Sequence, residues 1–321
     1  MILAAGGTVV QAPAIDLDMA TDFLATRFGA KASDVEPVAQ GDWSRAFAFR
    51  SAGADRIVRF ASVVDDFQRD RAAARYASPD LPIPAVLEIG EAFDGYYAIS
   101  VRGFGEFLED LDADAFARAV PAVLRMLDAL RAVELDAYAG AGAWHGDGPA
   151  ERASWRAHLL GVADDHPDSR THGWRERLAT RADDEAAFVD AFARMEPLVD
   201  ACPELRHLIH SDLLHGNVLV ADDRVAAVFD WQCALAGDFL YDVAWLTFWS
   251  AWFPSLAALD LRDAVMAHHH DIGLAVPDFD ARLRCYEIHT GLATMSYQAF
   301  ISDWTDLSWT AQRTLELAAT A

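Results

Sequence analysis

A segment in the second half of the chain, residues 207–231, places carboxylates, an amide and histidines around two short apolar runs. Asp212 and Asn217 precede the first run, a turn follows at residues 221–224, and the second run leads into Asp230. A hairpin brings its two ends to one edge, so we expect these three side chains to converge. Carboxylate and amide oxygens suit Mg²⁺, with phosphate completing its shell. A carboxylate beside that cation can accept the proton of an attacking hydroxyl, so the spacing predicts phosphate transfer.

The same segment supports an interpretation of another class. Three histidines and one acid follow the spacing H-x-x-H-x-D-x-x-H, which resembles the transition-metal cluster of a hydrolase. These residues are His207, His210, Asp212 and His215. The hydrolase interpretation leaves Asn217 and Asp230 without a role.

The chain before this segment changes character near residue 102. We expect helices from Asp16 or Asp18 to Phe28 and over residues 66–77, a hairpin over 46–50 and 56–60, and further strands over 85–89 and 96–101. Beyond Arg102 the pattern is mainly helical, most clearly over residues 116–133, 155–162, 185–199, 286–300 and 308–319, with a helix pair broken at Pro254. We therefore predict an α+β, bilobal fold. Residues 1–102 form a small antiparallel-sheet lobe including the hinge, and residues 103–321 form a larger helical lobe that carries the hairpin.

The composition limits the classes of partner. With 26 Lys and Arg against 50 Asp and Glu, the formal net charge is −24. Such a field repels nucleic acid and anionic lipid, so we expect no nucleic-acid or membrane binding and favour cationic partners. The three separated cysteines and the absence of a signal-peptide pattern favour a cytoplasmic location.

The loop motif resembles that of a known family. His210 to Asn217, followed by an apolar strand that ends in Asp230, resembles the H-x-D-x-x-x-x-N catalytic loop and metal-binding Asp of the aminoglycoside phosphotransferase branch of the kinase-like superfamily. Residues 237–244 resemble the G-D-x-x-Y-D-x-A helix start of the same branch. Further stretches resemble the hygromycin B phosphotransferases within it, in order, namely residues 41–49, 81–91, 202–212 and 249–252. The resemblance implies a protein-kinase-like fold and nucleotide- and Mg²⁺-dependent transfer of phosphate to a hydroxyl.

The resemblance also implies roles for individual residues. Asp212 would orient and deprotonate the acceptor hydroxyl, and Asn217 with Asp230 would hold Mg²⁺ on the phosphates of ATP or GTP. His210 and Asp242 would support the loop.

One departure from the kinase pattern concerns the lysine that usually reaches the nucleotide phosphates from the third strand of the small lobe. The only lysine here, Lys31, precedes the sheet and does not fill that role. Arg59 occupies the corresponding strand position, and Asp70 on the next helix is the matching acid. A guanidinium stays charged and can grip phosphate with two N–H groups. We also expect Gly41 and Ser44 to lie over the phosphates.

The hinge and the helical lobe complete the expected sites. Ser100 and Arg102 lie where the hinge would meet the nucleotide base. The resemblance favours a polycationic aminoglycoside such as hygromycin B as substrate, with antibiotic resistance as the role. Substrate-facing candidates are Trp249, Trp252, Asp238 and Glu287. We expect a monomer. A small-metabolite kinase of the same fold, or a kinase-like binding module without catalysis, remain as alternatives.

Overall fold

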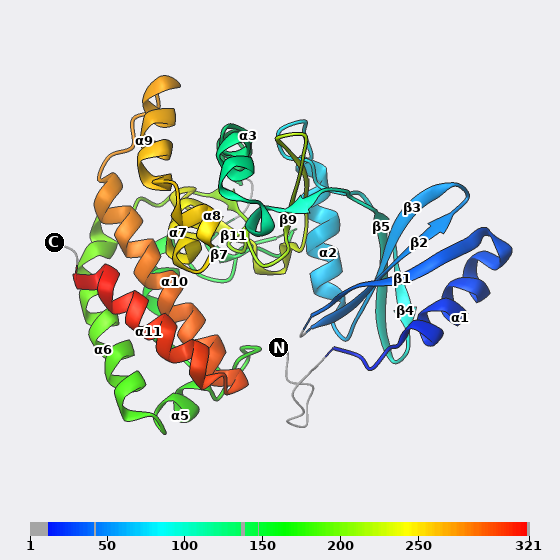
Figure 1. The fold of residues 1–321 in the computed structure, drawn as a ribbon. Coiled ribbons are helices and arrows are strands. Elements are labelled where there is room, and N and C mark those ends of the chain that lie inside the picture. The colour runs from blue at the N-terminus through cyan, green and yellow to red at the C-terminus, as the bar shows by residue number, and fades with distance from the viewer. Residues whose placement is uncertain (1–11, 42, 136–138, 147, 320–321) are drawn as a thin grey trace.

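The computed structural model describes residues 12–41, 43–135, 139–146 and 148–319. Asp42, within the turn expected over the phosphates, lies outside this part of the chain. The described residues form a sheet-rich N-terminal lobe and a larger helical lobe beside it (Figure 1). This arrangement confirms the predicted α+β, bilobal architecture.

The N-terminal lobe is built on a five-stranded antiparallel sheet with the order β1-β2-β3-β5-β4. Its strands are β1 (Ala32–Gln40), β2 (Ser44–Ser51), β3 (Ala54–Ala61), β4 (Val86–Ala92) and β5 (Gly95–Val101). The β2–β3 hairpin and the β4–β5 pair match the expected strands. Strand β1 was not predicted, because its sequence lacks alternation and contains Pro37, and its pairing with β2 has two register shifts. Proline and bulges are typical of an edge strand.

The two faces of this sheet pack against different elements. Phe49, Phe60 and Ile99 pack on one face against α1 (Leu17–Phe28), where they form a core with Leu24. Residues of the opposite register, such as Arg59, line a cavity between the lobes. Because successive strand residues point to opposite faces, the alternation that predicts the hairpin also selects the side chains that reach the cavity.

Helix α1 begins where the sequence predicted. Asp16 is its N-cap and accepts a hydrogen bond from the Met19 backbone N–H at 2.9 Å. The 3₁₀ turn η1 (Gly29–Lys31) then leads into β1, so Lys31 lies before the sheet and does not line the cavity.

The helical lobe encloses one large apolar core, in which α10 is buried along most of its length. Its helices are α3 (Ala113–Arg131), α4 (Trp155–Leu160), α5 (Trp174–Leu178), α6 (Ala182–Met195), α7 (Leu240–Trp249), α8 (Pro254–Ala257), α9 (Leu261–Asp271), α10 (Phe279–Ile301) and α11 (Trp304–Ala319). Further 3₁₀ turns are η2 (Ala74–Tyr76), η3 (Leu108–Asp110), η4 (Gly161–Ala163), η5 (Glu196–Ala201), η6 (Trp231–Cys233) and η7 (Ser250–Trp252). Pro254 begins α8, as the predicted break requires. None of the described helices has the length and apolar character needed to cross a membrane.

Two small sheets hold the central loops of this lobe. One has the order β10-β9-β6, with β6 (Glu106–Phe107), β9 (Val218–Ala221) and β10 (Arg224–Val228). The other has the order β7-β11-β8, with β7 (Gly142–Ala143), β8 (His207–Ile209) and β11 (Leu235–Gly237). Asp222 and Asp223 form the β9–β10 turn with φ of 50° and 56°. Positive φ at both positions is typical of the tight turn that closes a two-residue hairpin.

Helix α2 (Val64–Ala73) belongs to the N-terminal lobe but is fastened to the helical lobe. The Arg170 guanidinium donates to both carboxylate oxygens of Asp66 at 3.0 and 2.6 Å. Asp70 accepts a hydrogen bond from the Trp231 backbone N–H at 2.8 Å. These contacts fix α2 relative to the segment around Arg170 and to the loop that follows β10.

Candidate active site

The loop after β8 is held by a buried carboxylate on α7. Asp242 accepts hydrogen bonds from the backbone N–H groups of His210 at 3.0 Å and Ser211 at 2.8 Å. Burial raises the pKa of Asp242 to about 7, against the opposing effect of these two N–H groups. Ser211 has a φ of 57°, so the chain turns sharply at the point that Asp242 secures.

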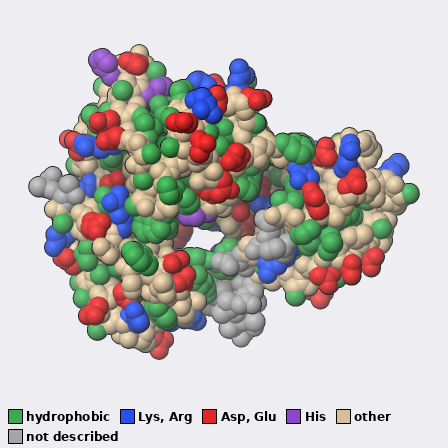
Figure 2. Space-filling model, viewed as in Figure 1, with side chains coloured by type: hydrophobic (Ala, Val, Ile, Leu, Met, Phe, Trp, Pro, Cys, Tyr) green, Lys and Arg blue, Asp and Glu red, His purple; other side chains and the backbone are tan. Residues whose placement is uncertain are grey.

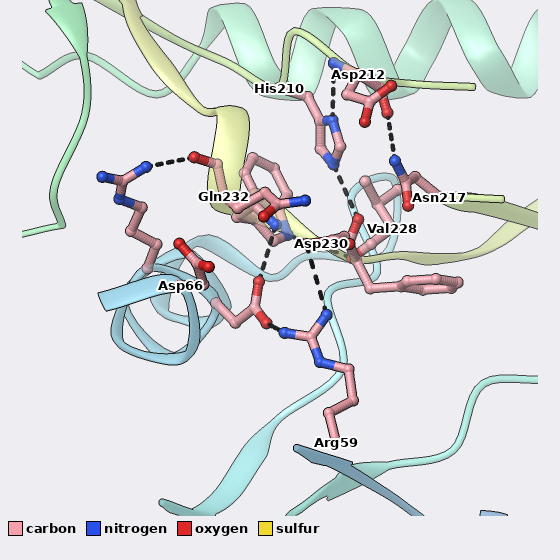
Figure 3. A network of polar contacts seen from close by, with 12 residues as sticks. Arg59, Asp66, His210, Asp212, Asn217, Val228, Asp230 and Gln232 are labelled. Atoms are coloured by element: carbon pink, nitrogen blue, oxygen red, sulfur yellow. Dashed lines mark hydrogen bonds and ion pairs between the residues drawn. The ribbon is translucent and has the colours of Figure 1, made fainter. Parts of the chain in front are cut away.

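His210 joins the two ends of the hairpin (Figure 3). Its Nε2 lies 3.0 Å from the carbonyl oxygen of Phe229, and its Nδ1 lies 3.2 Å from the backbone nitrogen of Asp212. The imidazole therefore donates from Nε2 and accepts at Nδ1. Burial lowers the pKa of His210, which is consistent with a neutral ring.

Asn217 is oriented by the backbone of Asp212, the acid of the same motif. Its Nδ2 donates to the backbone carbonyl of Asp212 at 2.9 Å (Figure 3). Because the amide nitrogen is engaged in this bond, the carbonyl oxygen Oδ1 is the atom left for a cation. Asn217 is buried and lines the cavity between the lobes.

Asp230 follows β10 and faces the sheet of the other lobe. Its φ of 65° is left-handed, and its Oδ1 lies 3.5 Å from Nη1 of Arg59. The same guanidinium forms an ion pair with Asp70 through Nη2. Burial by itself would lower the pKa of Arg59, but Asp70 and then Asp230 more than offset this effect and hold the pKa raised. Arg59 is therefore a permanent cation placed between two acids.

The cavity between the lobes has a volume of about 530 Å³. Every residue expected to bind the nucleotide lines it, namely Gly41, Ser44, Arg59, Asp70, Ser100 and Arg102. Asn217 and Asp230 line it from the helical lobe. The residues expected to bind nucleotide and cation thus meet in one cavity, which both lobes enclose. Asp212, which was expected to converge with these two residues, is not among those that line the cavity, but its carboxylate lies 3.0 Å from Nδ1 of His215, which does line it.

The donor set at this edge fits Mg²⁺. Asp230 and Asn217 offer hard oxygen atoms, and two protein ligands with phosphate oxygens and water make up the shell that Mg²⁺ prefers. Across the described ranges, no group of three or more His, Cys, Asp or Glu residues could hold a metal ion. The hydrolase cluster of His207, His210, Asp212 and His215 is therefore not formed, and the engaged ring nitrogens of His210 give one reason.

The substrate-facing candidates occupy different environments. Trp249 is half-buried, and its ring centroid lies 4.8 Å from that of His215. Trp252 is 36% exposed and lies 5.0 Å from Trp249 by the same measure. The tryptophan pair is thus adjacent to the loop that follows β8, with Trp249 in contact with His215.

Asp238 and Glu287 differ from the expectation that they line a cleft. Asp238 is fully buried and accepts hydrogen bonds from the Arg282 guanidinium at 3.0 and 2.8 Å and from the Tyr286 hydroxyl at 2.5 Å. Glu287 is 8% exposed and accepts a hydrogen bond from the Thr247 hydroxyl at 2.6 Å. Both carboxylates instead join α10 to the segment around α7.

The comparisons with known proteins agree with this geometry. A model described as "Phosphotransferase enzyme family" matches residues 34–273. The chain belongs to this phosphotransferase family. Hygromycin-B 4-O-kinase of Escherichia coli is a relative with 33% identity over 296 residues, which cover 91% of this chain and 82% of the relative.

Solved structures of the phosphotransferase family share the fold. A thermostable mutant of aminoglycoside phosphotransferase APH(4)-Ia, in ternary complex with AMP-PNP and hygromycin B, has 30% identity and a TM-score of 0.81, over 92% of this chain and 97% of that chain. The GDP complex of aminoglycoside 2'-phosphotransferase-IIIa has 14% identity and a TM-score of 0.65, over 95% and 99%, and this likeness concerns the fold alone. These findings confirm the predicted kinase-like fold and a phosphotransferase that acts on a hydroxyl group.

The sequence analysis missed two parts of the site. His215 was considered only as a metal ligand, whereas it contacts Asp212 and lines the cavity. Phe104 and Phe107 also line the cavity just after the hinge. Two aromatic residues within five positions of Arg102 are a signal that could have indicated this wall.

Proposed function

We propose that this phosphotransferase transfers the terminal phosphoryl group of ATP or GTP to a hydroxyl of a small cationic molecule of the aminoglycoside class. Hygromycin B is the first candidate, and antibiotic resistance is the corresponding role. The observation that carries the proposal is the placement of Asn217 and Asp230 opposite Arg59 around one cavity, with Asp212 in contact with His215, which also lines it.

Each residue then has a defined task. Asp212 accepts the proton of the acceptor hydroxyl, whose oxygen forms a bond to the terminal phosphorus while the bond to the leaving diphosphate breaks. Arg59 binds the phosphates and is kept in place by Asp70. Ser44 and the backbone near Gly41 cover the phosphates, and the segment at Ser100 and Arg102 meets the base. Transfer of this kind depends on positioning and on neutralising charge.

Asn217 and Asp230 are the residues that would hold Mg²⁺. The cation supplies neutralisation of the phosphate charge. His210 and Asp242 keep the loop in shape through the hydrogen bonds described above. Residues 1–102 accordingly form the nucleotide-binding part, and residues 103–321 carry the catalytic loop and the acceptor site.

The charge of the molecule supports a cationic acceptor. The formal net charge of −24 raises the local concentration of cations. Acidic side chains are frequent on the face of the helical lobe that Figure 2 shows. Trp249 and Trp252 lie beside the catalytic loop, where their rings can stack on a sugar ring. The same charge opposes binding to nucleic acid, and we propose a monomer that acts in the cytoplasm.

A nucleotide-consumption screen tests the proposed function. The purified protein is incubated with Mg²⁺ and either ATP or GTP, against hygromycin B, other aminoglycosides, macrolides and simple amino alcohols, and the products are analysed by mass spectrometry. We expect one aminoglycoside to gain a single phosphoryl group and the Asp212→Asn variant to form none above background.

Other outcomes of the screen separate the alternatives. Phosphorylation of amino alcohols without any antibiotic product would identify a small-metabolite kinase. Nucleotide binding without turnover of any acceptor would contradict the aminoglycoside assignment.

A further inference from the structure

His215 makes a contact that the loop motif does not require. Its Nδ1 lies 3.0 Å from Oδ1 of Asp212, and the two residues are only three positions apart. The His215 side chain is 41% exposed and the Asp212 side chain 20%. Neither side chain is therefore in the core, and His215 lines the cavity.

Aromatic residues after the loop restrict the orientation of the His215 ring. Trp249 meets it edge to face at 4.8 Å between centroids, and Trp245 does so at 6.1 Å. Phe253 adds a third aromatic contact, at 6.1 Å between centroids. These edge-to-face contacts limit the directions of the ring plane, and the contact with Asp212 sets the side to which Nδ1 points.

The backbone at this position is also unusual. His215 has a φ of 61° and is followed by Gly216 with a φ of 83°. A left-handed conformation is uncommon for a residue with a side chain and is maintained only where the surroundings require it. Leu214 just before is fully buried, so the chain turns from the core to the cavity at His215.

The chemistry of the contact assigns the proton. An ionised carboxylate can only accept hydrogen bonds, so Nδ1 of His215 is the donor. Oδ1 of Asp212 is thereby engaged, whereas Oδ2 accepts no hydrogen bond from the residues that the structure describes. A carboxylate held by one oxygen presents the other in a defined direction.

We propose that His215 is a positioning residue for the phosphoryl transfer, which holds the Asp212 carboxylate through Nδ1 so that Oδ2 accepts the proton of the acceptor hydroxyl. This inference rests on the proposed function of Asp212. It assigns His215 no hydrogen bond to nucleotide or cation. Although the ring lines the cavity, a substitution that keeps a ring there affects the chemical step more than nucleotide affinity.

Two variants separate the hydrogen bond from the ring. His215→Asn keeps an N–H donor close to the position of Nδ1, and asparagine tolerates positive φ. His215→Phe keeps a ring for Trp249 but removes the donor. His268→Phe is a matched control. His268 lies on helix α9, outside the lining of the cavity, and its Nε2 lies 2.6 Å from the carboxylate of Asp128.

We expect His215→Phe to lower kcat about 10- to 100-fold, since a small misplacement of a catalytic group has effects of this size. The KM for nucleotide and the rise in Tm on adding Mg²⁺-nucleotide stay within twofold of wild type. His215→Asn recovers most of kcat, and His268→Phe leaves it unchanged. A kcat within twofold of wild type in His215→Phe, or an equal loss in His215→Asn, would overturn the proposal.

The ¹⁵N chemical shifts of the His215 ring provide a readout that needs no substrate. We expect the Nδ1–H tautomer in the wild-type protein and its loss in Asp212→Ala. If the wild-type protein phosphorylates no acceptor while this tautomer is present, the proposed function fails and the contact stands. If the Nε2–H tautomer dominates in wild type, the positioning role itself is wrong.

Discussion

Arg59 and Asp70 form an ion pair that crosses from strand β3 to helix α2, and the second oxygen of Asp70 accepts the Trp231 backbone N–H at 2.8 Å. The carboxylate thus connects the arginine of the sheet to the residue after Asp230. The position of the Arg59 guanidinium is therefore set by the helical lobe as well as by its own strand. This relationship accounts for an arginine where kinases usually carry lysine, because a guanidinium can contact Asp70 and Asp230 together.

Removal of the Arg59 guanidinium is expected to weaken nucleotide binding. Arg59→Ala should raise the Kd for Mg²⁺-nucleotide by roughly 10-fold or more, since a hydrogen bond to a charged group is worth about 1.5–3 kcal/mol. The Kd of Arg59→Lys should lie between those of wild type and Arg59→Ala, because lysine keeps the charge but cannot contact phosphate with two N–H groups of one planar guanidinium. Arg56→Ala, at a position of the same strand outside the cavity, serves as the control. Equal Kd values for Arg59→Ala and Arg56→Ala in calorimetric titrations would argue against phosphate binding by Arg59.

Replacement of the Asp212 carboxylate should affect chemistry and spare binding. We expect Asp212→Asn to lower kcat by about 10²–10⁴-fold, the range typical of a lost general base. The rise in Tm on addition of Mg²⁺-nucleotide should remain as in wild type, because Asp212 does not line the nucleotide cavity. A variant that retains more than a tenth of the wild-type kcat would show that another group takes the proton.

The Arg170–Asp66 pair should stabilise the junction between the lobes. Asp66 is 6% exposed, so Arg170→Ala removes the bidentate hydrogen bonds of a buried carboxylate. We expect a loss on the order of 2–4 kcal/mol in the free energy of unfolding, measured by denaturant titration. Asp66→Asn combined with Arg170→Ala should recover part of it.

The surface pair Arg118–Asp223 provides the control for this measurement. Its side chains are 58% and 52% exposed, and Arg118→Ala should cost less than about 1 kcal/mol. Similar losses for Arg170→Ala and Arg118→Ala would mean that the junction does not depend on the buried pair.

Asp242 makes stability depend on pH in a defined direction. Burial raises its pKa to about 7 in the folded protein, whereas the pKa of an aspartate in an unfolded chain is about 3.9. The folded state therefore binds this proton more tightly than the unfolded state. The resulting contribution to the free energy of unfolding is fully present below the pKa of the unfolded chain and is lost as the pH rises through about 7. The slope is at most about 1.4 kcal/mol per pH unit.

The Asp242→Asn variant isolates this contribution. The variant lacks the titrating group. From pH 5 to pH 8, the free energy of unfolding of wild type should therefore fall relative to that of the variant by roughly 1 kcal/mol or more. Unfolding free energies over this range measure the difference. Parallel profiles for the two proteins would contradict a raised pKa at Asp242.

Local sequence patterns predicted those parts of the molecule that depend on local geometry. The β9–β10 hairpin follows from two apolar runs around Asp222 and Asp223, and it brings Asn217 and Asp230 to one cavity. Arg59 was assigned from the resemblance to the kinase pattern, and it lines the cavity from β3. The predicted end of the second helix was too late, because α2 ends at Ala73 and a 3₁₀ turn continues the chain.

Contacts between distant segments could not be predicted in this way. Asp238 was expected in a cleft because it follows the metal loop, but its partner Arg282 lies 44 residues further along and draws it into the core. The contact of His215 with Asp212 depends on a left-handed backbone at His215, which residue type alone does not predict. Strand β1 is maintained by pairing with β2 rather than by its own pattern.

The Mg²⁺ dependence of nucleotide binding tests the central claim most directly, that Asn217 and Asp230 hold a divalent cation on the phosphates opposite Arg59. Isothermal titration of ATP and GTP into wild type and Asp230→Asn, each with and without Mg²⁺, measures this dependence. We predict that Mg²⁺ increases the affinity of wild type by roughly tenfold or more and leaves that of Asp230→Asn almost unchanged. An equal Mg²⁺ effect in both proteins would contradict the account.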